Sequence, residues 1–415
     1  MERREFLKLG GAGLLVASGV GVSSLPVHAA AVSIDLEISN TRIELIDGKR
    51  VEMLAYSGRG NGPSIGPRVP GAVLRVTEGD WITVTVRNRR LEPHGFEIGG
   101  IPASMLRMEG DSTGTVSFQA PAAGTYMYHD ASHGSRHLYR MLGLHGAFIV
   151  HPRNGLSVNG TAMTPYSIDL APTSPASKSV STVFEAFGKT TRFPGQQWVP
   201  CPIEKEFDRQ ERIWIFNEID PRFNALIRPD GISASTIADT PEAVRKNFVP
   251  RYFTINGRSG FDLQTAYDVV VKNYVGEPTL LRTMNVGLAH HATHIHGNHL
   301  LEVAHSVLTD DGFIPLMGSA ATQVWGQVVL HDNIWERDTW PTWPMQIRDM
   351  ILPFEAPPDI PNWEKFEKGA EEPFPLRYVM HDHCEMGTTA AGGNYPQGAV
   401  IHWQISGPVN GRRSV

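Results

Sequence analysis

The segment LRVTEGDWITVTVRNRR, residues 74–90, alternates apolar and polar residues around a Gly-Asp turn. The segment YDVVVKNYVGEPTLLRTMN, residues 267–285, has the same layout around a Gly-Glu turn. Alternation with a period of two, bounded by turn residues, predicts β-strands. Because the pattern recurs in both halves of the chain, we predict an all-β protein made of two matching modules.

The composition agrees with this prediction and excludes one class of partner. A chain of 415 residues is long enough for more than one domain. Its 41 glycines and 30 prolines fit many short strands joined by turns. The net charge is only -6 and no basic stretch occurs, so we expect no nucleic-acid partner.

The N-terminus has the pattern of an export signal. Arg3 and Arg4 precede an apolar run, and small residues follow near Ala30. This pattern predicts a twin-arginine signal peptide over residues 1–31 and a periplasmic mature protein. An uncleaved anchor is the alternative, although the run is short for a membrane span. We expect no membrane span in the mature chain.

The predicted strands divide the rest of the chain into three parts. The first module covers residues 32–155 and the second covers residues 250–410. Residues 156–249 are interpreted as a linker with added elements, including a probable strand at 212–220. A degenerate middle domain is the alternative interpretation of this stretch.

Histidines occupy alternate positions in HATHIHGNH, residues 291–299, and in MHDHCE, residues 380–385. Residues i and i+2 of a strand point to the same side, so each motif presents two imidazoles together. Converging imidazoles are typical ligands of copper and zinc. The two pairs are His294 with His296 and His381 with His383.

A third group of histidines lies in the first module. The segment YHDASHGSRH, residues 128–137, contains His129 and His133, and EPHG contains His94. These positions complete the set of candidate metal ligands. The full set is His94, His129, His133, His294, His296, His381 and His383.

Four segments resemble the multicopper oxidase family, and they occur in that family's order. The segments are EPHG, which resembles HWHG; YHDASH, which resembles YHSH; HATHIHGNH, which resembles HPxHLHGH; and HDHCEMG, which resembles HCHxxxH. The stretch from 216 to 258 is most similar to the short, two-domain members. The resemblance implies tandem cupredoxin-like Greek-key β-barrels, copper where first and second modules meet, and a homotrimer in which those modules come from neighbouring chains.

The resemblance also implies roles for individual histidines. His294 matches a ligand of the mononuclear type 2 copper, and His291 matches a ligand of the type 1 copper. The positions that match the dinuclear type 3 site are His94, His129, His296, His381 and His383.

The chain departs from the family pattern at positions that matter. Ala131 stands where a type 3 histidine is expected, and His133 is a possible replacement two residues later. Glu92 takes the place of the other type 2 histidine. Asp382 replaces the type 1 cysteine and Gly387 replaces a second type 1 histidine. A blue copper site needs a cysteine thiolate with two imidazoles, so we expect a degraded type 1 site.

The sequence leaves the roles of two carboxylates open. Glu92 is a metal ligand, an acceptor that orients an imidazole, or a solvated loop residue. Asp382 points to the side of its strand opposite the two flanking histidines. It either hydrogen-bonds His291 or packs with solvent.

Cys384 has three alternative roles. It can pair with Cys201 in a disulfide in an oxidising compartment, or it can lie near the metal. Its strand parity also permits a displaced thiolate–copper site with His291 and Met386.

These features predict a copper-dependent oxidoreductase with roughly two or three copper ions. Because the type 1 relay is missing, we expect dioxygen and a small reducing substrate, such as a phenol or a metal ion, to react at the histidine site. The alternative is a non-catalytic copper-binding protein for tolerance, storage or delivery. A metal-free scaffold, as in the family's cell-division relatives, and a two-domain nitrite reductase are further alternatives.

Overall fold

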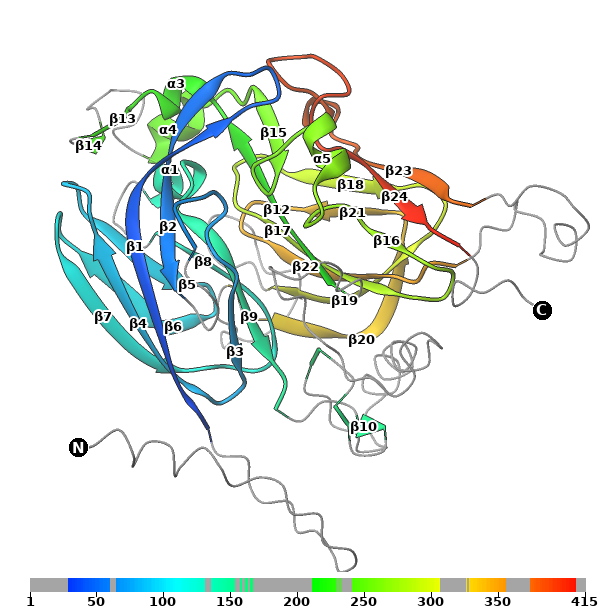
Figure 1. Cartoon of the computed structure of the whole chain (residues 1–415), viewed down its shortest axis with the longest axis horizontal. Coiled ribbons are helices and arrows are strands. Elements are labelled where there is room, and N and C mark those ends of the chain that lie inside the picture. Colours follow the sequence, from blue (N-terminus) through cyan, green and yellow to red (C-terminus); the bar gives the residue numbers. More distant parts are fainter. Residues whose placement is uncertain are drawn as a thin grey trace, which may run out of the picture. The chain divides into compact units, whose positions relative to one another are not determined.

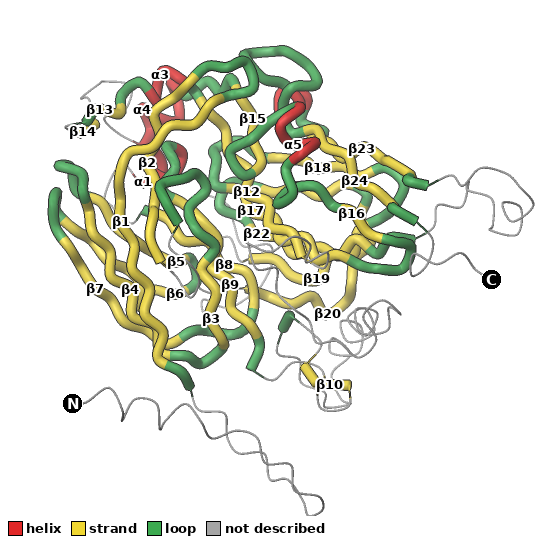
Figure 2. Tube along the Cα trace, in the orientation of Figure 1, coloured by secondary structure: helices red, strands yellow, loops and turns green. Residues whose placement is uncertain are grey.

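The computed structural model describes residues 29–59, 65–130, 136–153, 157–158, 161–162, 165–166, 211–229, 231–232, 241–306, 326, 328–355 and 374–407. Residues 1–28 of the predicted export signal, His133, Ala131 and Cys201 lie outside these residues. Strands dominate the described part of the chain, as Figure 2 shows. The predicted all-β fold of cupredoxin-like sheets is confirmed.

The first module consists of two sheets that face each other across an apolar core. The four-stranded sheet has the order β2 (Arg50–Arg59), β1 (Ala31–Glu44), β4 (Trp81–Asn88) and β7 (Thr113–Gln119). The five-stranded sheet has the order β3 (Leu74–Thr77), β9 (His145–His151), β8 (Gly124–His129), β5 (His94–Ile98) and β6 (Ile101–Met108).

The second module repeats the two-sheet plan around its own core. The six-stranded sheet has the order β15 (Tyr252–Ile255), β12 (Glu211–Ile219), β17 (Thr279–Asn285), β22 (Ile347–Leu352), β19 (Leu300–Ser306) and β20 (Val328–Arg337). The five-stranded sheet has the order β16 (Lys272–Asn273), β24 (Val400–Ile405), β23 (Leu376–Asp382), β18 (His291–Ile295) and β21 (Thr339–Thr342).

The remaining described elements are short. Two hairpins are β10 (Ser157–Val158) with β11 (Thr161–Ala162) and β13 (Ile227–Arg228) with β14 (Gly231–Ile232). The helices are α1 (Arg136–Met141), α3 (Pro221–Asn224), α4 (Pro241–Asn247), α5 (Phe261–Thr265) and the 3₁₀ turn η2 (Glu385–Thr388).

The Gly-Asp turn at residues 79–80 joins two different sheets. The chain leaves β3 in one sheet, turns at Gly79 and enters β4 in the other sheet. Gly276 makes the same crossing between β16 and β17 in the second module. Both glycines have a φ near +80°, at 80° and 76°, which a residue with a Cβ rarely adopts. The strand–turn–strand pattern therefore marks a switch between sheets in each module.

The strand predicted at 212–220 is β12, and it lies inside the six-stranded sheet of the second module. It runs parallel to β17 and antiparallel to β15. The linker region therefore supplies an inner strand to the second module, which local alternation alone does not reveal.

The two modules pack together through a shared apolar cluster. Met127 and Ile149 of the first module are buried with Ile215, Met284 and Ile347 of the second. Strand β8 contacts β20 and β22, as can be followed in Figure 1. Burial on both faces explains why β17 is buried along its whole length and does not alternate.

Candidate metal centre

Four histidines gather on the outer side of the five-stranded sheet of the second module. Strands β18 and β23 are antiparallel neighbours, and their register pairs His294 directly with His381. His383 and His296 follow two residues after these positions, so all four point the same way. We call this group the histidine cluster: His294, His296, His381 and His383.

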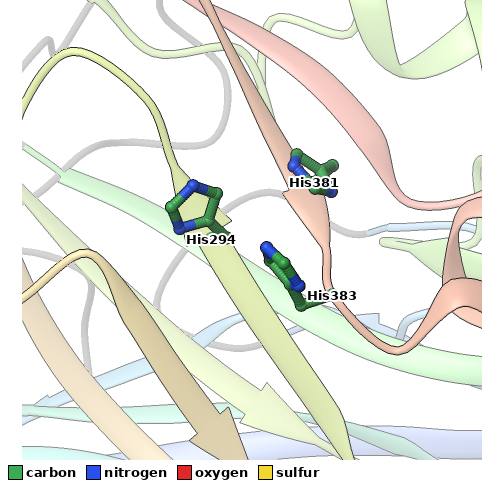
Figure 3. A group of neighbouring side chains, drawn as sticks. All are labelled: His294, His381 and His383. Carbon is green, nitrogen blue, oxygen red and sulfur yellow. The ribbon is translucent and has the colours of Figure 1, made fainter.

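The ring nitrogens of the cluster are close enough to share metal ions. One ligand atom from each of His294, His381 and His383 lies within 4.8 Å of the others, and Figure 3 shows the three rings around a common space. The Nε2 atoms of His296 and His381 lie 3.3 Å apart. The ring centroids of His294 and His296 are 4.6 Å apart. His294 and His381 are half-buried, whereas His296 and His383 are exposed.

Hydrogen bonds fix the orientation of two rings. Nδ1 of His294 lies 3.0 Å from the carbonyl oxygen of Asp338 and 2.8 Å from the hydroxyl of Thr339. Nδ1 of His381 lies 3.2 Å from the carbonyl oxygen of Asp382. A proton on Nδ1 leaves Nε2 as the acceptor that faces the cluster, which is the usual arrangement of a metal-ligating histidine.

The electrostatics of the cluster favour neutral imidazoles. Burial lowers the pKa of His294, and the neighbouring His296 lowers it further. Burial likewise lowers the pKa of His381, with His383 and His296 adding to the effect. Neutral imidazole is the form that binds a metal ion. The donor set is all nitrogen and solvent-accessible, which fits copper.

The opposite side of β18 carries a histidine in a different environment. His291 is fully buried between two carboxylates. Its Nδ1 lies 2.6 Å from Oδ2 of Asp382, and its Nε2 lies 2.8 Å from Oε1 of Glu218. Of the two roles left open for Asp382, the structure has the hydrogen bond to His291. Glu218 lies on β12 of the six-stranded sheet and was not predicted as a partner, because only the packing of the two sheets brings its side chain to His291.

Burial opposes a charge on His291 and is the largest influence on its pKa. The hydrogen bonds to Asp382 and Glu218 outweigh burial and raise the pKa to about 9. Carboxylates only accept hydrogen bonds, so both ring nitrogens donate and the ring is an imidazolium. This ring has no lone pair to offer a metal at neutral pH.

His94 has the same environment in the first module. It is fully buried, its Nδ1 lies 2.8 Å from Oδ2 of Asp130, and its Nε2 lies 3.2 Å from Oε1 of Glu92. Burial opposes the charge, but the hydrogen bonds to Asp130 and Glu92 raise the pKa of His94. Glu92 therefore accepts a hydrogen bond from an imidazole, and it also pairs with Arg90.

The other candidates of the first module do not join the histidine cluster in the described part of the chain. His129 is buried at the end of β8, and its Nδ1 lies 2.8 Å from the carbonyl oxygen of Asp130. Neither His94 nor His129 is among the ligand atoms that converge with His294. Whether His129 and His133 bind metal stays a prediction.

Cys384 contacts a histidine that the sequence did not single out. Its Sγ lies 3.2 Å from Nε2 of His290, and the His290 ring stacks on Trp343. Burial, together with the charge of Asp382, raises the pKa of the Cys384 thiol to about 11. The imidazole that the displaced thiolate site requires, His291, is held by carboxylates on both sides.

A second group of potential ligands lies on β19 and β20. Atoms of Glu302, His305 and His331 lie within 4.8 Å of one another. A bulge after Glu302 brings it to the same face as His305, which ordinary alternation would separate. Glu302 also accepts hydrogen bonds from Arg337 and Arg348, so two guanidinium groups already neutralise it. This surplus of positive charge makes the group less suited to a cation than the histidine cluster.

Comparisons with known proteins agree with this geometry. A family model described as multicopper oxidase matches residues 48–155. Copper resistance protein A of Escherichia coli is 33% identical over 166 residues, which are 37% of this chain and 26% of that protein. A copper-containing nitrite reductase of Alcaligenes xylosoxydans xylosoxydans is 29% identical over 119 residues, 26% of this chain and 33% of the relative. The chain thus aligns with about a quarter to a third of the length of these relatives.

Solved structures match almost the whole chain. The blue copper oxidase of Nitrosomonas europaea aligns with a TM-score of 0.54 and 21% identity over 90% of this chain and 85% of that one. The multicopper oxidase mgLAC aligns with a TM-score of 0.57 and 18% identity over 91% and 86%. At these identities the likeness concerns the fold.

Proposed function

Because the chain belongs to the multicopper oxidase family, we propose that it is a copper-dependent oxidoreductase whose metal is held by the histidine cluster. The observation that supports this proposal most directly is that ring nitrogens of His294, His381 and His383 converge on one surface of the sheet. The cofactor of this family is copper, and imidazole ligands support both of its oxidation states.

Bound copper would supply reversible one-electron transfer between a reducing substrate and dioxygen. The residues of this chain would hold and orient the copper. Asp338 and Thr339 hold the His294 ring through Nδ1, which leaves the lone pair of its Nε2 available for the metal. His296 and His383 are exposed, which leaves the centre open to small molecules from solvent. We therefore propose a small substrate, such as a phenol or a metal ion, that reaches the centre directly.

We further propose a homotrimer in which the first module of a neighbouring chain borders the histidine cluster and leaves room for a small substrate. Two of the four rings face solvent in the single chain, and a bordering surface would restrict the access of bulk water to the centre. Sedimentation should give a mass of three chains, and a stable monomer with full copper occupancy would contradict this proposal.

The proposed location is the periplasm, reached by the twin-arginine route. The paired arginines near the N-terminus support this route. Among the described residues, no helix is long and apolar enough to cross a membrane. Fractionation of cells that express the full chain, with a variant in which Arg3 and Arg4 are lysines, tests the route.

The experiment for the enzyme is oxygen consumption by copper-loaded protein with a phenol and with cuprous or ferrous ion. We expect His296→Ala and His381→Ala to abolish consumption. His402→Ala is the matched control, because His402 is an exposed histidine of the neighbouring strand β24 whose Nδ1 is already bonded to Gln264. Full activity in either cluster variant would refute the proposed centre.

The second candidate function is a copper-binding protein without oxidase activity. The observation that favours it is the environment of His291, which holds carboxylates where an electron-accepting copper site needs ligands. Bound copper without oxygen consumption would support this candidate. If no copper binds, the remaining interpretation is that the protein is a metal-free scaffold.

A further inference from the structure

The two modules share a short structural repeat that the residue-by-residue resemblance does not contain. Asn88 of the first module donates from Nδ2 to the carbonyl oxygen of Glu92 at 2.9 Å. Asn285 of the second module donates in the same way to Ala289 at 2.7 Å. Their Oδ1 atoms accept the N–H two residues later, at 2.9 and 2.8 Å. Each asparagine lies six residues before an interior histidine, His94 or His291.

The strand registers extend the repeat. Glu97 pairs with His129 in the first module, as His294 pairs with His381 in the second. Counting back along each strand makes His94 equivalent to His291. Counting forward from His129 and His381 makes Asp130 equivalent to Asp382.

These equivalences give His94 a different place from the one that the family resemblance implied. The resemblance aligned His94 with the second histidine of HWHG, a position on the outer, type 3 side. The strand register instead puts it on the inner side of its sheet, equivalent to the histidine that matched the type 1 copper. Its hydrogen bond to Asp130 repeats the bond between His291 and Asp382.

The inner position does not fit a type 1 copper in either module. The donor set there has no thiolate, and the ring nitrogens of His291 both donate to carboxylates. The carboxylates also fill the space: a Cβ on Gly387 would lie 2.0 Å from Oδ2 of Asp382. A Cβ on Gly287 would lie 2.1 Å from Oε2 of Glu218.

Backbone groups complete these carboxylate sites. Oδ1 of Asp382 accepts the N–H groups of Ala292 and Cys384, both at 2.9 Å. Oε2 of Glu218 accepts those of Leu288 and Ala289, at 2.7 and 3.2 Å. The carboxylates are thus fixed by the fold itself, independently of any metal.

We infer that a histidine clamped between two carboxylates replaces the type 1 copper in both modules, as Glu218–His291–Asp382 and Glu92–His94–Asp130. This inference extends the proposed function, because it leaves the histidine cluster as the place where electrons enter. The interior triads also have a structural role. Asp382 ties β18 to the loop after β23, and thereby sets the distance between His294 and the pair His381 and His383.

The test measures copper per chain and the visible and paramagnetic resonance spectra after loading with Cu(II) and with Cu(I). We expect no copper–thiolate charge-transfer band in the wild type. His291→Asn and His94→Asn should each bind as much copper as the wild type, whereas His294→Ala should lose at least one ion. An intense thiolate band, or the loss of one copper in His291→Asn, would overturn the inference.

A second measurement covers the case in which these variants fail to fold. Nitrogen-15 spectra of histidine-labelled wild-type protein should show signals, assigned to His291 and His94 by their absence from the Asn variants or by sequential assignment, with both nitrogens protonated at neutral pH. These two signals should keep their chemical shifts when diamagnetic Cu(I) is added. A shift of either signal on copper binding would overturn the inference. If no copper binds at all, the proposed function fails, but the two protonated rings would still support the triads.

Discussion

Asp382 accepts a hydrogen bond from Nδ1 of His291 at 2.6 Å, and its two sequence neighbours are His381 and His383 of the histidine cluster. One strand therefore presents metal-ligand candidates on its outer side and a buried ion pair on its inner side. The side chain that matched the type 1 cysteine stabilises the interior by charge instead of by a metal bond. The histidine cluster and the ion pair can be varied separately by mutation.

The first prediction concerns stability at high pH. His291 has a pKa of about 9 in the folded chain and about 6.5 when unfolded, so folding favours its protonated form. This contribution, on the order of 3 kcal/mol, is fully present below pH 6.5 and is lost as the pH rises through 9. We expect the free energy of unfolding in urea to fall between these values. The Asn variant of His291 should lose most of that pH dependence; an unchanged slope would contradict the assignment.

The second prediction concerns the glycine that stands where the family has a histidine. Gly387→Ala places a methyl group 2.0 Å from Oδ2 of Asp382, so the carboxylate that accepts the hydrogen bond of His291 must shift. We expect a loss of stability of about 1–3 kcal/mol. Gly66→Ala is the control, because no atom lies within 4 Å of its Cβ position. Equal melting temperatures for both variants would argue against a tightly filled inner site.

The sequence predicted the fold and the histidine cluster for the same physical reason. Alternation along a strand is local, so the pairing of His294 with His296 and of His381 with His383 follows from the period of two. The convergence of the two pairs required β18 and β23 to be neighbours, and the family resemblance supplied that information.

The interior triads could not be predicted in full, because their members come from separated strands. Glu218 lies on β12, in a region that the sequence marked only as an elaboration. The position of His94 depended on strand register, and one short motif does not fix a register. An internal comparison of HGFEIGG, residues 94–100, with HATHIHG, residues 291–297, would have revealed the equivalence.

The third prediction concerns a buried ion group between the modules. Glu211 of β12 is fully buried and accepts hydrogen bonds from Arg282 at 2.5 Å and from Arg75 of the first module at 2.7 Å. Burial opposes the charge of Glu211, but the two arginines lower its pKa to about 2. Glu211→Gln leaves Asp349, 3.3 Å from Arg282, as the remaining carboxylate of this ion group beside two guanidinium groups. One buried positive charge of the group then lacks a counter-charge, so we expect a loss of about 3–5 kcal/mol in the free energy of unfolding.

The control for this variant is Glu44→Gln, which removes an exposed ion pair with Arg50. Exposed pairs contribute about 0–1 kcal/mol, so this variant should behave like the wild type. Because the pKa of Glu211 is lowered, its contribution is present above pH 4.5 and disappears as the pH falls toward 2. Equal unfolding free energies for the two variants would show that the buried group does not join the modules.

The last prediction concerns removal of copper. The inner neighbours of the histidine cluster, Ile295 and Met380, belong to an apolar core that needs no metal. Chelator-treated protein should therefore keep its β-sheet circular dichroism. Copper at one hundred times its dissociation constant should add about 2.7 kcal/mol by mass action. This increment should be smaller in His294→Ala and persist in full in His402→Ala, as differential scanning calorimetry can measure. Unfolding on chelation would mean that the apolar core needs the metal, and the prediction that the core is stable without copper would then be wrong.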